Sequence, residues 1–315
     1  MKNPEAKLKI KRLNSSPYFK PQFTIEEKTK LSTFGEVLDK DSPLVPNVLI
    51  TNTHTQFDKI SEELCNTLTL IIHPNSGYDN ISLEFIKKIE APVIVGNTIR
   101  AHAVTNYILS GLFHHFANLP KTPFWDHERK WKRKLLKESK IAIIGYGHIG
   151  KLLTECLSPL VKTLCIYDPF ENKPELDIKN ADAVILACGL NSKSRHIIDK
   201  KFLNQISENA LIINAARGEC IETQNLVSFL KANPEAYAIL DVFEKEPCDF
   251  SQFKDLKNIT LTSHIAGVFS SIDDATIAFE SQVLSDFSTM TEFDFQNKYQ
   301  KMILQNKIHP SLGIL

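Results

Sequence analysis

The sequence predicts an α/β protein of two domains, each built on a parallel β-sheet. Strand-like and helix-like segments alternate in two series, one before residue 100 and one after residue 140. Such alternation is typical of strand–helix–strand units, whose strands pair in parallel. A length of 315 residues is also comfortable for two domains.

The first series begins with a charged stretch, 7–13, that predicts an edge strand, followed by a predicted helix over 24–38. Short apolar runs then predict three strands separated by helices. The strands are expected over 47–52, 68–73 and 92–96, and the helices over 58–65, 82–89 and 100–118.

The second series contains six apolar runs, which a sheet covered on both faces requires. The strands are expected over 141–145, 163–168, 183–188, 211–216, 236–242 and 259–264. The tail of a last helix, over 273–290, is expected to return to the first domain. We therefore expect residues 1–100 plus 288–315 to form one domain and residues 101–287 the other.

Composition favours a cytoplasmic protein. The net charge is zero, which gives no reason to expect a nucleic acid or a membrane as partner, and the basic run 123–140 is expected to be a solvated arm. We see no secretory signal and no membrane-spanning stretch. The six scattered cysteines indicate reduced thiols, and the adjacent His114 and His115 cannot face one metal on a helix, so no metal is expected.

A glycine-rich turn indicates a dinucleotide site. The strand over 141–145 runs into the G-Y-G-H-I-G sequence of residues 145–150, and a helix is expected to follow. In such a turn Gly145 bends the chain, Gly147 lets the backbone approach a pyrophosphate and Gly150 lets the helix pack closely. The helix N-terminus attracts the phosphates. The next strand ends at Asp168, which would bind the ribose hydroxyls and repel a 2′-phosphate, so NAD is favoured.

Three later strands end in polar residues that suit a dehydrogenase. They are followed by Asn214–Gly218, Asp241–Pro247 and Ser263–Gly267. Arginine matches a carboxylate, histidine exchanges a proton, and a carboxylate orients the histidine. Each residue alone has a structural alternative, a hydrogen-bonding histidine or an arginine in a salt bridge, but the set favours catalysis by Arg217, Glu246 and His264.

These motifs resemble the D-isomer-specific 2-hydroxyacid dehydrogenase family. The resemblance rests on G-Y-G-H-I-G with the downstream Y-D, then N-A-A-R-G, L-D-V-F-E-K-E-P and S-H-I-A-G, and on N-S-G-Y-D-N at 75–80. It implies two Rossmann- or flavodoxin-like domains with an active-site cleft between them. It also implies a homodimer that uses NAD to interconvert a small 2-oxo acid and its D-2-hydroxy acid.

When the family's functional residues are matched to this sequence, the resemblance implies that Arg217 binds the substrate carboxylate. It also implies that His264 is the acid/base and that Glu246 orients His264. The backbone amides of Ser76 and Gly77 would hold the carboxylate, and Asp241 the nicotinamide. The cofactor residues expected are Gly145, Gly147, His148, Ile149, Gly150, Asp168, Ala215, Ala216, Asp241 and Gly267.

The chain departs from the family pattern at Ser263, at Cys188–Gly189 and at Arg100, where asparagine is common. Arg100 either pairs with a surface acid or the cofactor phosphates, or supplies a second anion site for a substrate with a distal carboxylate. The alternative to an enzyme is a dinucleotide-sensing regulatory protein on the same scaffold, because fold alone does not fix function.

Overall fold

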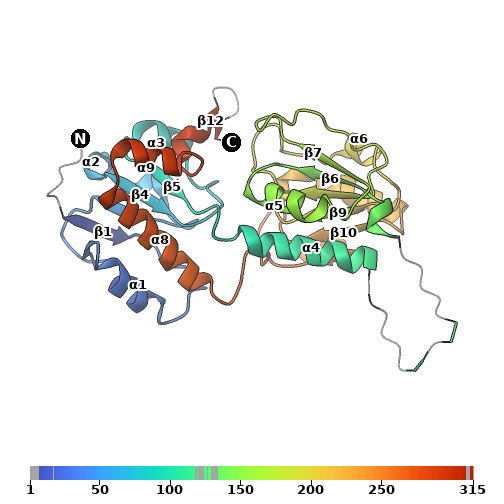
Figure 1. Cartoon of the computed structure of the whole chain (residues 1–315), viewed down its shortest axis with the longest axis horizontal. Coiled ribbons are helices and arrows are strands. Elements are labelled where there is room, and N and C mark those ends of the chain that lie inside the picture. The colour runs from blue at the N-terminus through green and yellow to red at the C-terminus, as the bar shows by residue number, and fades with distance from the viewer. Residues whose placement is uncertain are drawn as a thin grey trace. The chain divides into compact units, whose positions relative to one another are not determined.

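In the computed structural model the chain divides into two compact units: residues 1–100 with 269–315 (unit 1) and residues 101–268 (unit 2). The structure describes residues 7–309 and 313–314, except 17, 118, 120–123, 126 and 129–133. Residues 123, 126 and 129–133 of the basic run 123–140 therefore lie outside the described residues. Figure 1 shows the order of the elements along the chain.

Unit 1 is built on a parallel sheet of five strands in the order β2-β1-β3-β4-β5. Its strands are β1 (Leu8–Arg12), β2 (Gly35–Val37), β3 (Val48–Ile50), β4 (Leu70–His73) and β5 (Val93–Val95). Its helices are α1 (Phe23–Leu31), α2 (Glu62–Thr67), α3 (Leu83–Lys88), α8 (Ile272–Thr289) and α9 (Glu292–Tyr299). A short β12 (Ile308–His309) pairs antiparallel with β13 (Gly313–Ile314).

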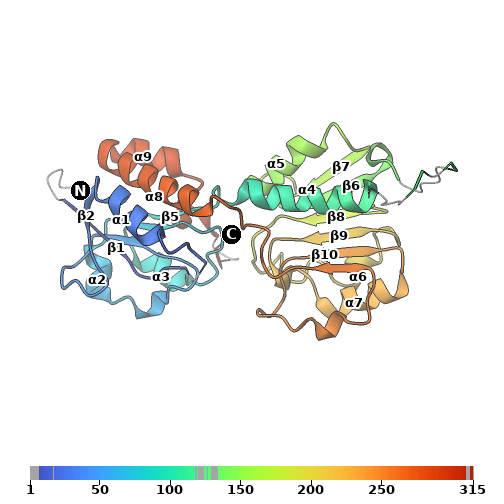
Figure 2. The same cartoon turned by 90° about the horizontal axis from the view of Figure 1, so that it is seen from below.

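Successive residues of these strands pack on opposite faces of the sheet, as the pleat requires. Ile50 and Ile72 belong to one core, together with residues of α8 and α9. Leu49 and Ile71 belong to a second core, with residues of α3. Figure 2 shows α8 and α9 on one face and α2 and α3 on the other.

The start of unit 1 differs from the expected edge strand and long helix. The helix ends at Leu31, and residues 35–37 form β2, so β2 lies at the edge and β1 is internal. Gly35 permits this pairing, because a Cβ there would lie 2.3 Å from the Leu8 carbonyl oxygen. The glycine thus lets the residues after the helix pair closely with β1.

The second boundary between the units also differs from the expected one. The units divide at 268/269, before α8, rather than at 287/288, because the apolar face of α8 packs on the sheet of unit 1. Val283 and Leu284 are fully buried in that core.

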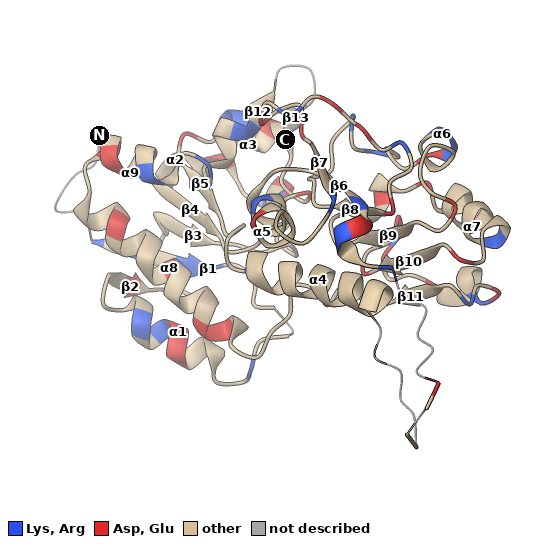
Figure 3. Cartoon of the chain, turned by 45° about the vertical axis from the view of Figure 1, so that its right-hand side comes forward, with Lys and Arg blue, Asp and Glu red and all other residues tan. Residues whose placement is uncertain are grey.

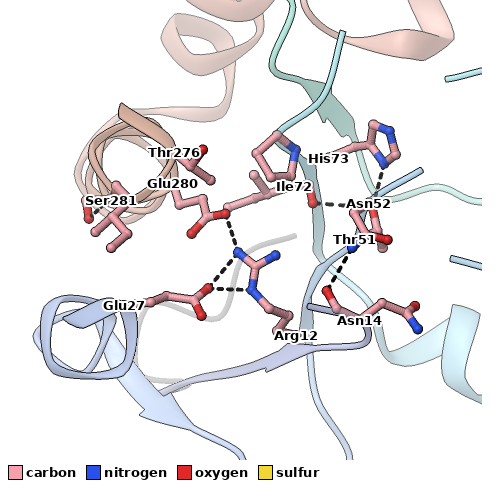
Figure 4. Close-up of polar contacts among 12 residues, drawn as sticks. Arg12, Asn14, Glu27, Thr51, Asn52, Ile72, His73, Thr276, Glu280 and Ser281 are labelled. Carbon is pink, nitrogen blue, oxygen red and sulfur yellow. Dashed lines mark hydrogen bonds and ion pairs between the residues drawn. The ribbon is translucent and has the colours of Figure 1, made fainter. Parts of the chain in front are cut away.

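A buried ionic cluster also links α8 to β1 and α1 (Figure 4). Arg12 Nε donates to Glu27 Oε1 at 2.7 Å, and Arg12 Nη2 donates to Glu280 Oε1. Glu280 is fully buried, and this burial raises its pKa above the usual range, although Arg12 opposes the shift. Arg12 Nη1 and Glu280 Oε2 are buried without a hydrogen-bond partner in the described part of the chain.

Unit 2 is built on a parallel sheet of six strands in the order β11-β10-β9-β8-β6-β7. Its strands are β6 (Lys140–Ile144), β7 (Thr163–Tyr167), β8 (Ala183–Leu186), β9 (Leu211–Asn214), β10 (Tyr237–Leu240) and β11 (Ile259–Leu261). Its helices are α4 (Ala101–Ala117), α5 (His148–Leu157), α6 (Lys200–Leu203) and α7 (Thr223–Ala232).

Helices cover both faces of this sheet. Residues of α4 and α5 share one core with alternate strand residues, and residues of α6 and α7 share the other (Figure 2). The inner strands β8, β9 and β10 and the helix α4 carry no Lys, Arg, Asp or Glu (Figure 3). Burial on both faces accounts for the near-continuous apolar runs of the sequence. Among the described helices, none is long and apolar enough to cross a bilayer.

Candidate active site

The glycine-rich turn lies where the strand order of unit 2 reverses. The chain moves from β6 outward to β7 and then returns to place β8 on the other side of β6. Gly145, directly after β6, has a φ of +107°, and a Cβ there would lie 2.5 Å from the carbonyl carbon of Ala187. The turn therefore needs a glycine at this position. Ligands of open parallel sheets bind at such a reversal, beyond the carboxyl ends of the strands.

The next two glycines of the turn meet different surroundings. A Cβ at Gly150 would lie 2.1 Å from the Gly145 carbonyl oxygen, so this glycine brings α5 close to the strand. A Cβ at Gly147 would meet nothing within 4 Å, and Gly147 precedes the first turn of α5. Open space beside a helix N-terminus fits a dinucleotide pyrophosphate. His148 and Ile149, also expected to contact the cofactor, are the first two residues of α5.

Asp168 lies at the end of β7 beside this turn. Its Oδ2 accepts from the Tyr146 N–H at 2.8 Å and its Oδ1 from the Phe170 N–H at 3.0 Å. The carboxylate is thus fixed next to the glycine-rich loop, where an adenosine ribose is expected. Two lysines lie over the Tyr146 ring, Lys151 at 5.2 Å and Lys173 at 5.7 Å from its centroid.

His264 and Glu246 form a hydrogen-bonded pair at the same edge of the sheet. His264 Nδ1 lies 2.8 Å from Glu246 Oε2, and Glu246 Oε1 accepts from the Phe243 N–H at 3.0 Å. An ionised carboxylate only accepts, so Nδ1 carries a hydrogen and Nε2 is the nitrogen left to exchange a proton. The His264 side chain is 58% exposed, and its backbone is left-handed at φ +54°. The geometry suits an acid/base group oriented by a carboxylate.

Asp241, at the end of β10, organises the loop that carries His264. Its Oδ1 accepts from the Thr262 hydroxyl at 2.6 Å and the Ile265 N–H at 2.7 Å, and its Oδ2 accepts from the Ala266 N–H at 2.8 Å. Its backbone carbonyl accepts the His264 N–H at 2.8 Å. A carboxylate has about four acceptor positions, so Oδ2 keeps one for the nicotinamide that Asp241 is expected to hold. Gly267 follows in the same loop.

Arg217 extends from the loop after β9. Its Nη1 donates to the Ala216 carbonyl at 2.7 Å. The Asn214 side chain stabilises the turn, because it donates to the Arg217 carbonyl at 2.9 Å and accepts from the Ala216 N–H at 3.0 Å. A Cβ at Gly218 would lie 1.8 Å from the carbonyl carbon of Phe243. The turn of residues 214–218, which includes Ala215, therefore packs against the backbone of the segment that leads to Glu246.

Glu244, two residues before Glu246, is engaged elsewhere. Its Oε1 lies 2.8 Å from His196 Nε2, and its Oε2 accepts from the Thr223 N–H at 3.1 Å. The sequence indicated Glu246 as the partner of His264, and the contacts of the two carboxylates agree with that choice.

Cys220 has an electrostatic environment that its sequence neighbours do not reveal. Its Sγ lies 3.9 Å from Cys188 Sγ, and the contact with Cys188, followed by the positive charge of Arg217, lowers the pKa of Cys220. The same contact and burial raise the pKa of Cys188. Cys220 is fully buried, which agrees with a packing role.

Ser76 and Gly77 belong to unit 1, in the loop after β4. Neither donates its backbone N–H to an acceptor within the part of the chain that the structure describes. The loop itself is well anchored, because the Gly96 N–H donates to the carbonyls of His73 at 2.8 Å and Asn75 at 3.1 Å. Two N–H groups in a fixed loop can donate hydrogen bonds to an anionic group.

Arg100 is also in unit 1 and is largely buried. Its Nη1 donates to the Pro74 carbonyl at 3.2 Å, and burial lowers its pKa. Within the described residues no carboxylate lies in ion-pair range of Arg100. The expected pairing with a surface acid is therefore not found there.

Comparison with known proteins gives a family for the greater part of unit 2. Residues 111–266 match the family described as D-isomer specific 2-hydroxyacid dehydrogenase, NAD binding domain. The chain is similar to the hydroxypyruvate reductase of Thermotoga maritima, at 26% identity over 261 residues, which cover 76% of this chain and 85% of that one. It is 28% identical over 249 residues to the erythronate-4-phosphate dehydrogenase of Wigglesworthia glossinidia brevipalpis, covering 75% of this chain and 59% of that longer protein.

Solved structures agree on the fold. The 3-phosphoglycerate dehydrogenase of Entamoeba histolytica, determined with NAD+ bound, superposes with a TM-score of 0.66 at 19% identity, covering 91% of this chain and 97% of that one. An NAD complex of a D-isomer specific 2-hydroxyacid dehydrogenase from Lactobacillus delbrueckii ssp. bulgaricus superposes with a TM-score of 0.68 at 18% identity, covering 89% and 97%. The sequence-based expectation of two parallel-sheet α/β domains is confirmed.

Proposed function

Because the chain belongs to the D-isomer-specific 2-hydroxyacid dehydrogenase family and carries its NAD-binding domain, we propose that it interconverts a small 2-oxo acid and its D-2-hydroxy acid. The observation that carries the proposal is the His264–Glu246 pair, 2.8 Å apart, at the same sheet edge as the dinucleotide turn. A proton exchanger beside a cofactor site is what reduction of a carbonyl requires.

Each residue has one role in the proposed reaction. When bound, the nicotinamide cofactor supplies the hydride for C2 of the 2-oxo acid and receives it in the reverse direction. His264 Nε2 donates a proton to the carbonyl oxygen during reduction and removes it from the hydroxyl during oxidation. Glu246 fixes the ring through Nδ1, and Arg217 binds the substrate carboxylate with its planar guanidinium. One 2-oxo acid, one hydride and one proton thus give one 2-hydroxy acid.

The proposal includes substrate contacts in unit 1. The unused N–H groups of Ser76 and Gly77 would donate to the substrate carboxylate. Arg100, a largely buried cation without an acid partner among the described residues, would bind a second carboxylate at the far end of the substrate. We therefore propose that a 2-oxo acid with a distal carboxylate is preferred.

The first test combines a substrate panel with catalytic variants. We expect NADH oxidation with at least one small 2-oxo acid, and a loss of about 10²- to 10⁴-fold in His264→Ala with NADH binding retained. Glu246→Gln should also lose activity, whereas the matched control Glu244→Gln should stay within about threefold of wild type, because Glu244 bonds to His196 instead. A wild-type protein inactive on the whole panel, but able to bind NADH, would indicate the dinucleotide sensor.

The second test concerns Arg100. Arg100→Ala should lower kcat/KM for oxaloacetate or 2-oxoglutarate by about one to two decades, the worth of a charge-assisted hydrogen bond, and leave glyoxylate nearly unchanged. An equal effect on both substrate classes would return Arg100 to a structural role.

A cytoplasmic homodimer completes the proposal. The family resemblance supports the homodimer. The six cysteines, all free among the described residues, support the cytoplasm. Light scattering coupled to size exclusion measures the mass of the assembly, and a monomer at micromolar concentration would contradict it.

A further inference from the structure

His73 is a fully buried histidine for which the proposed reaction has no use. It ends β4, a strand that is otherwise apolar, and directly precedes the loop with Ser76 and Gly77. Its two ring nitrogens are both engaged. Nε2 lies 2.8 Å from the Gly77 carbonyl oxygen, and Nδ1 lies 2.9 Å from the Thr51 hydroxyl oxygen (Figure 4 shows the Thr51 side).

The partners of the ring determine its tautomer. A carbonyl oxygen only accepts, so Nε2 must carry the hydrogen that is donated to Gly77. Nδ1 then has a lone pair, and the Thr51 hydroxyl donates to it. Burial, the largest cause, lowers the pKa of His73 to about 4, so the ring is neutral at physiological pH. A neutral ring in one tautomer provides a permanent donor to the loop.

We infer that His73 is a positioning residue, which holds Gly77 through the Nε2–H···O=C bond and so places the Ser76 and Gly77 amides for the substrate carboxylate. The inference rests on the proposed function. The Gly96 N–H holds the start of the same loop by donating to the carbonyls of His73 at 2.8 Å and Asn75 at 3.1 Å. With the loop held at both places, the N–H groups of Ser76 and Gly77 lie in a segment that need not reorganise when an anion binds.

Thr51 belongs to the same series of hydrogen bonds. Its hydroxyl, at the end of β3, selects the Nε2–H tautomer by donating to Nδ1. Without that donor the buried Nδ1 lone pair has no partner, and the opposite tautomer would direct a lone pair at the Gly77 carbonyl. The order of contacts is therefore Thr51, His73, Gly77 and then substrate.

Two variants of His73 separate positioning from packing. His73→Gln places an amide N–H where Nε2 was and can keep the bond to Gly77. His73→Asn places its amide nearer the former Nδ1 position and cannot reach Gly77. We expect His73→Asn to raise the KM for the 2-oxo acid about tenfold or more, the factor of one positioned hydrogen bond, with kcat and NADH affinity changed far less. His73→Gln should restore the KM to within about threefold.

Binding of oxamate, an unreactive 2-oxo acid analogue, gives a readout that does not depend on turnover. Oxamate affinity of the NADH complex, measured by nucleotide fluorescence, should fall about tenfold in His73→Asn and in Thr51→Val, and little in His73→Gln or Thr51→Ser.

If wild type turns over 2-oxo acids but the Gln and Asn variants have equal KM values, His73 is a packing residue and the inference is overturned. The same follows if substrate affinity falls only in step with thermal stability. A wild-type protein that neither reduces a 2-oxo acid nor binds oxamate overturns the proposed function, and this inference with it.

Discussion

At the scale of a single residue, we predict that Asp168 discriminates between NAD and NADP. Its carboxylate is fixed by the N–H groups of Tyr146 and Phe170, so it cannot swing away from a 2′-phosphate. We predict an NAD preference of at least about tenfold, equivalent to ~1.4 kcal/mol. Asp168→Ser should reduce that ratio, and the nearby Lys151 and Lys173 should help the variant accept NADPH.

The measurement is kcat/KM with each reduced cofactor and one 2-oxo acid. Asp168→Asn is the matched control, because it removes the charge but keeps the size of the side chain. Equal kcat/KM values for NADH and NADPH in the wild type would contradict the prediction.

His73 makes the free energy of unfolding depend on pH. Its pKa falls from 6.5 when exposed to about 4 in the folded state, chiefly through burial; the charge of Arg100 also lowers it, and Gly77 and Asp79 oppose the shift. Between those values the unfolded chain binds more protons, so stability is complete above pH 6.5 and falls as the pH drops toward 4. The maximal loss is about 3 kcal/mol.

Denaturant unfolding of wild type and His73→Gln at pH 7 and pH 4.5 measures this contribution. Carboxylates titrate in the same range, so the quantity of interest is the difference between the two proteins. The wild type should lose more stability than the variant on acidification. Identical losses would show that His73 does not remain neutral in the folded state.

At this scale, polar residues at the ends of apolar strands were the informative signal. It indicated Arg217, Glu246 and His264, and the structure brings Glu246 and His264 into contact. The same signal is present at His73 but is hidden by the adjacent N-S-G-Y-D-N motif. The contact between Cys188 and Cys220 could not be predicted, because no motif of the sequence pairs either cysteine with another residue.

The attachment of α8 to unit 1 depends on an ionic cluster as well as on apolar packing. Arg12 is the cation for two buried carboxylates, Glu27 and Glu280. Arg12→Met would leave both without a cation, and removing one partner of a buried ionic group typically costs about 3–5 kcal/mol. Glu280→Gln keeps an acceptor for Arg12 and leaves one carboxylate for one guanidinium, so we predict a loss of about 1 kcal/mol or less.

Hydrogen exchange of the β1 and α8 amides measures the effect where it occurs, since a chain of two units need not unfold in one step. Both variants should leave the β8 and β9 amides protected. An Arg12→Met variant no less stable than Glu280→Gln would show that the cluster does not hold α8.

Hydrophobic periodicity predicted most strands and helices correctly and a few wrongly. Apolar runs predicted β3–β11, and for the inner strands the reason is that burial on both faces is visible in composition. The pattern over 24–38 merged a helix with a strand, because the close approach of Gly35 to Leu8 is not visible in hydrophobic periodicity. The attachment of α8 to unit 1 could not be predicted, because the apolar face of a helix could pack on either sheet.

For the whole molecule, the division into two units predicts different behaviour for fragments. Unit 2 is one continuous segment, 101–268, with its own six-stranded sheet and cores on both faces. We predict that a fragment of residues 101–268 folds cooperatively and binds NADH. A fragment of residues 1–100 should not fold, because Ile10, Ile50 and Ile72 lose the helices that bury them.

Circular dichroism and NADH fluorescence of the two fragments test this. Fusing residues 269–315 to the short fragment through a flexible linker should restore folding, because it returns α8 and α9. A stable fold of residues 1–100 alone would show that α8 is dispensable to the first sheet.

Because unit 1 consists of two segments separated by unit 2, its parts are synthesised at different times. The sheet of unit 1 emerges first from the ribosome, but α8 and α9 emerge only after all of unit 2 has been translated. At about 5–20 residues per second, this delay is on the order of ten to thirty seconds. During it, unit 2 can complete its fold while the nascent first sheet has an uncovered apolar face. Newly made chains should therefore depend on chaperones at their N-terminal end, even though that end is synthesised first.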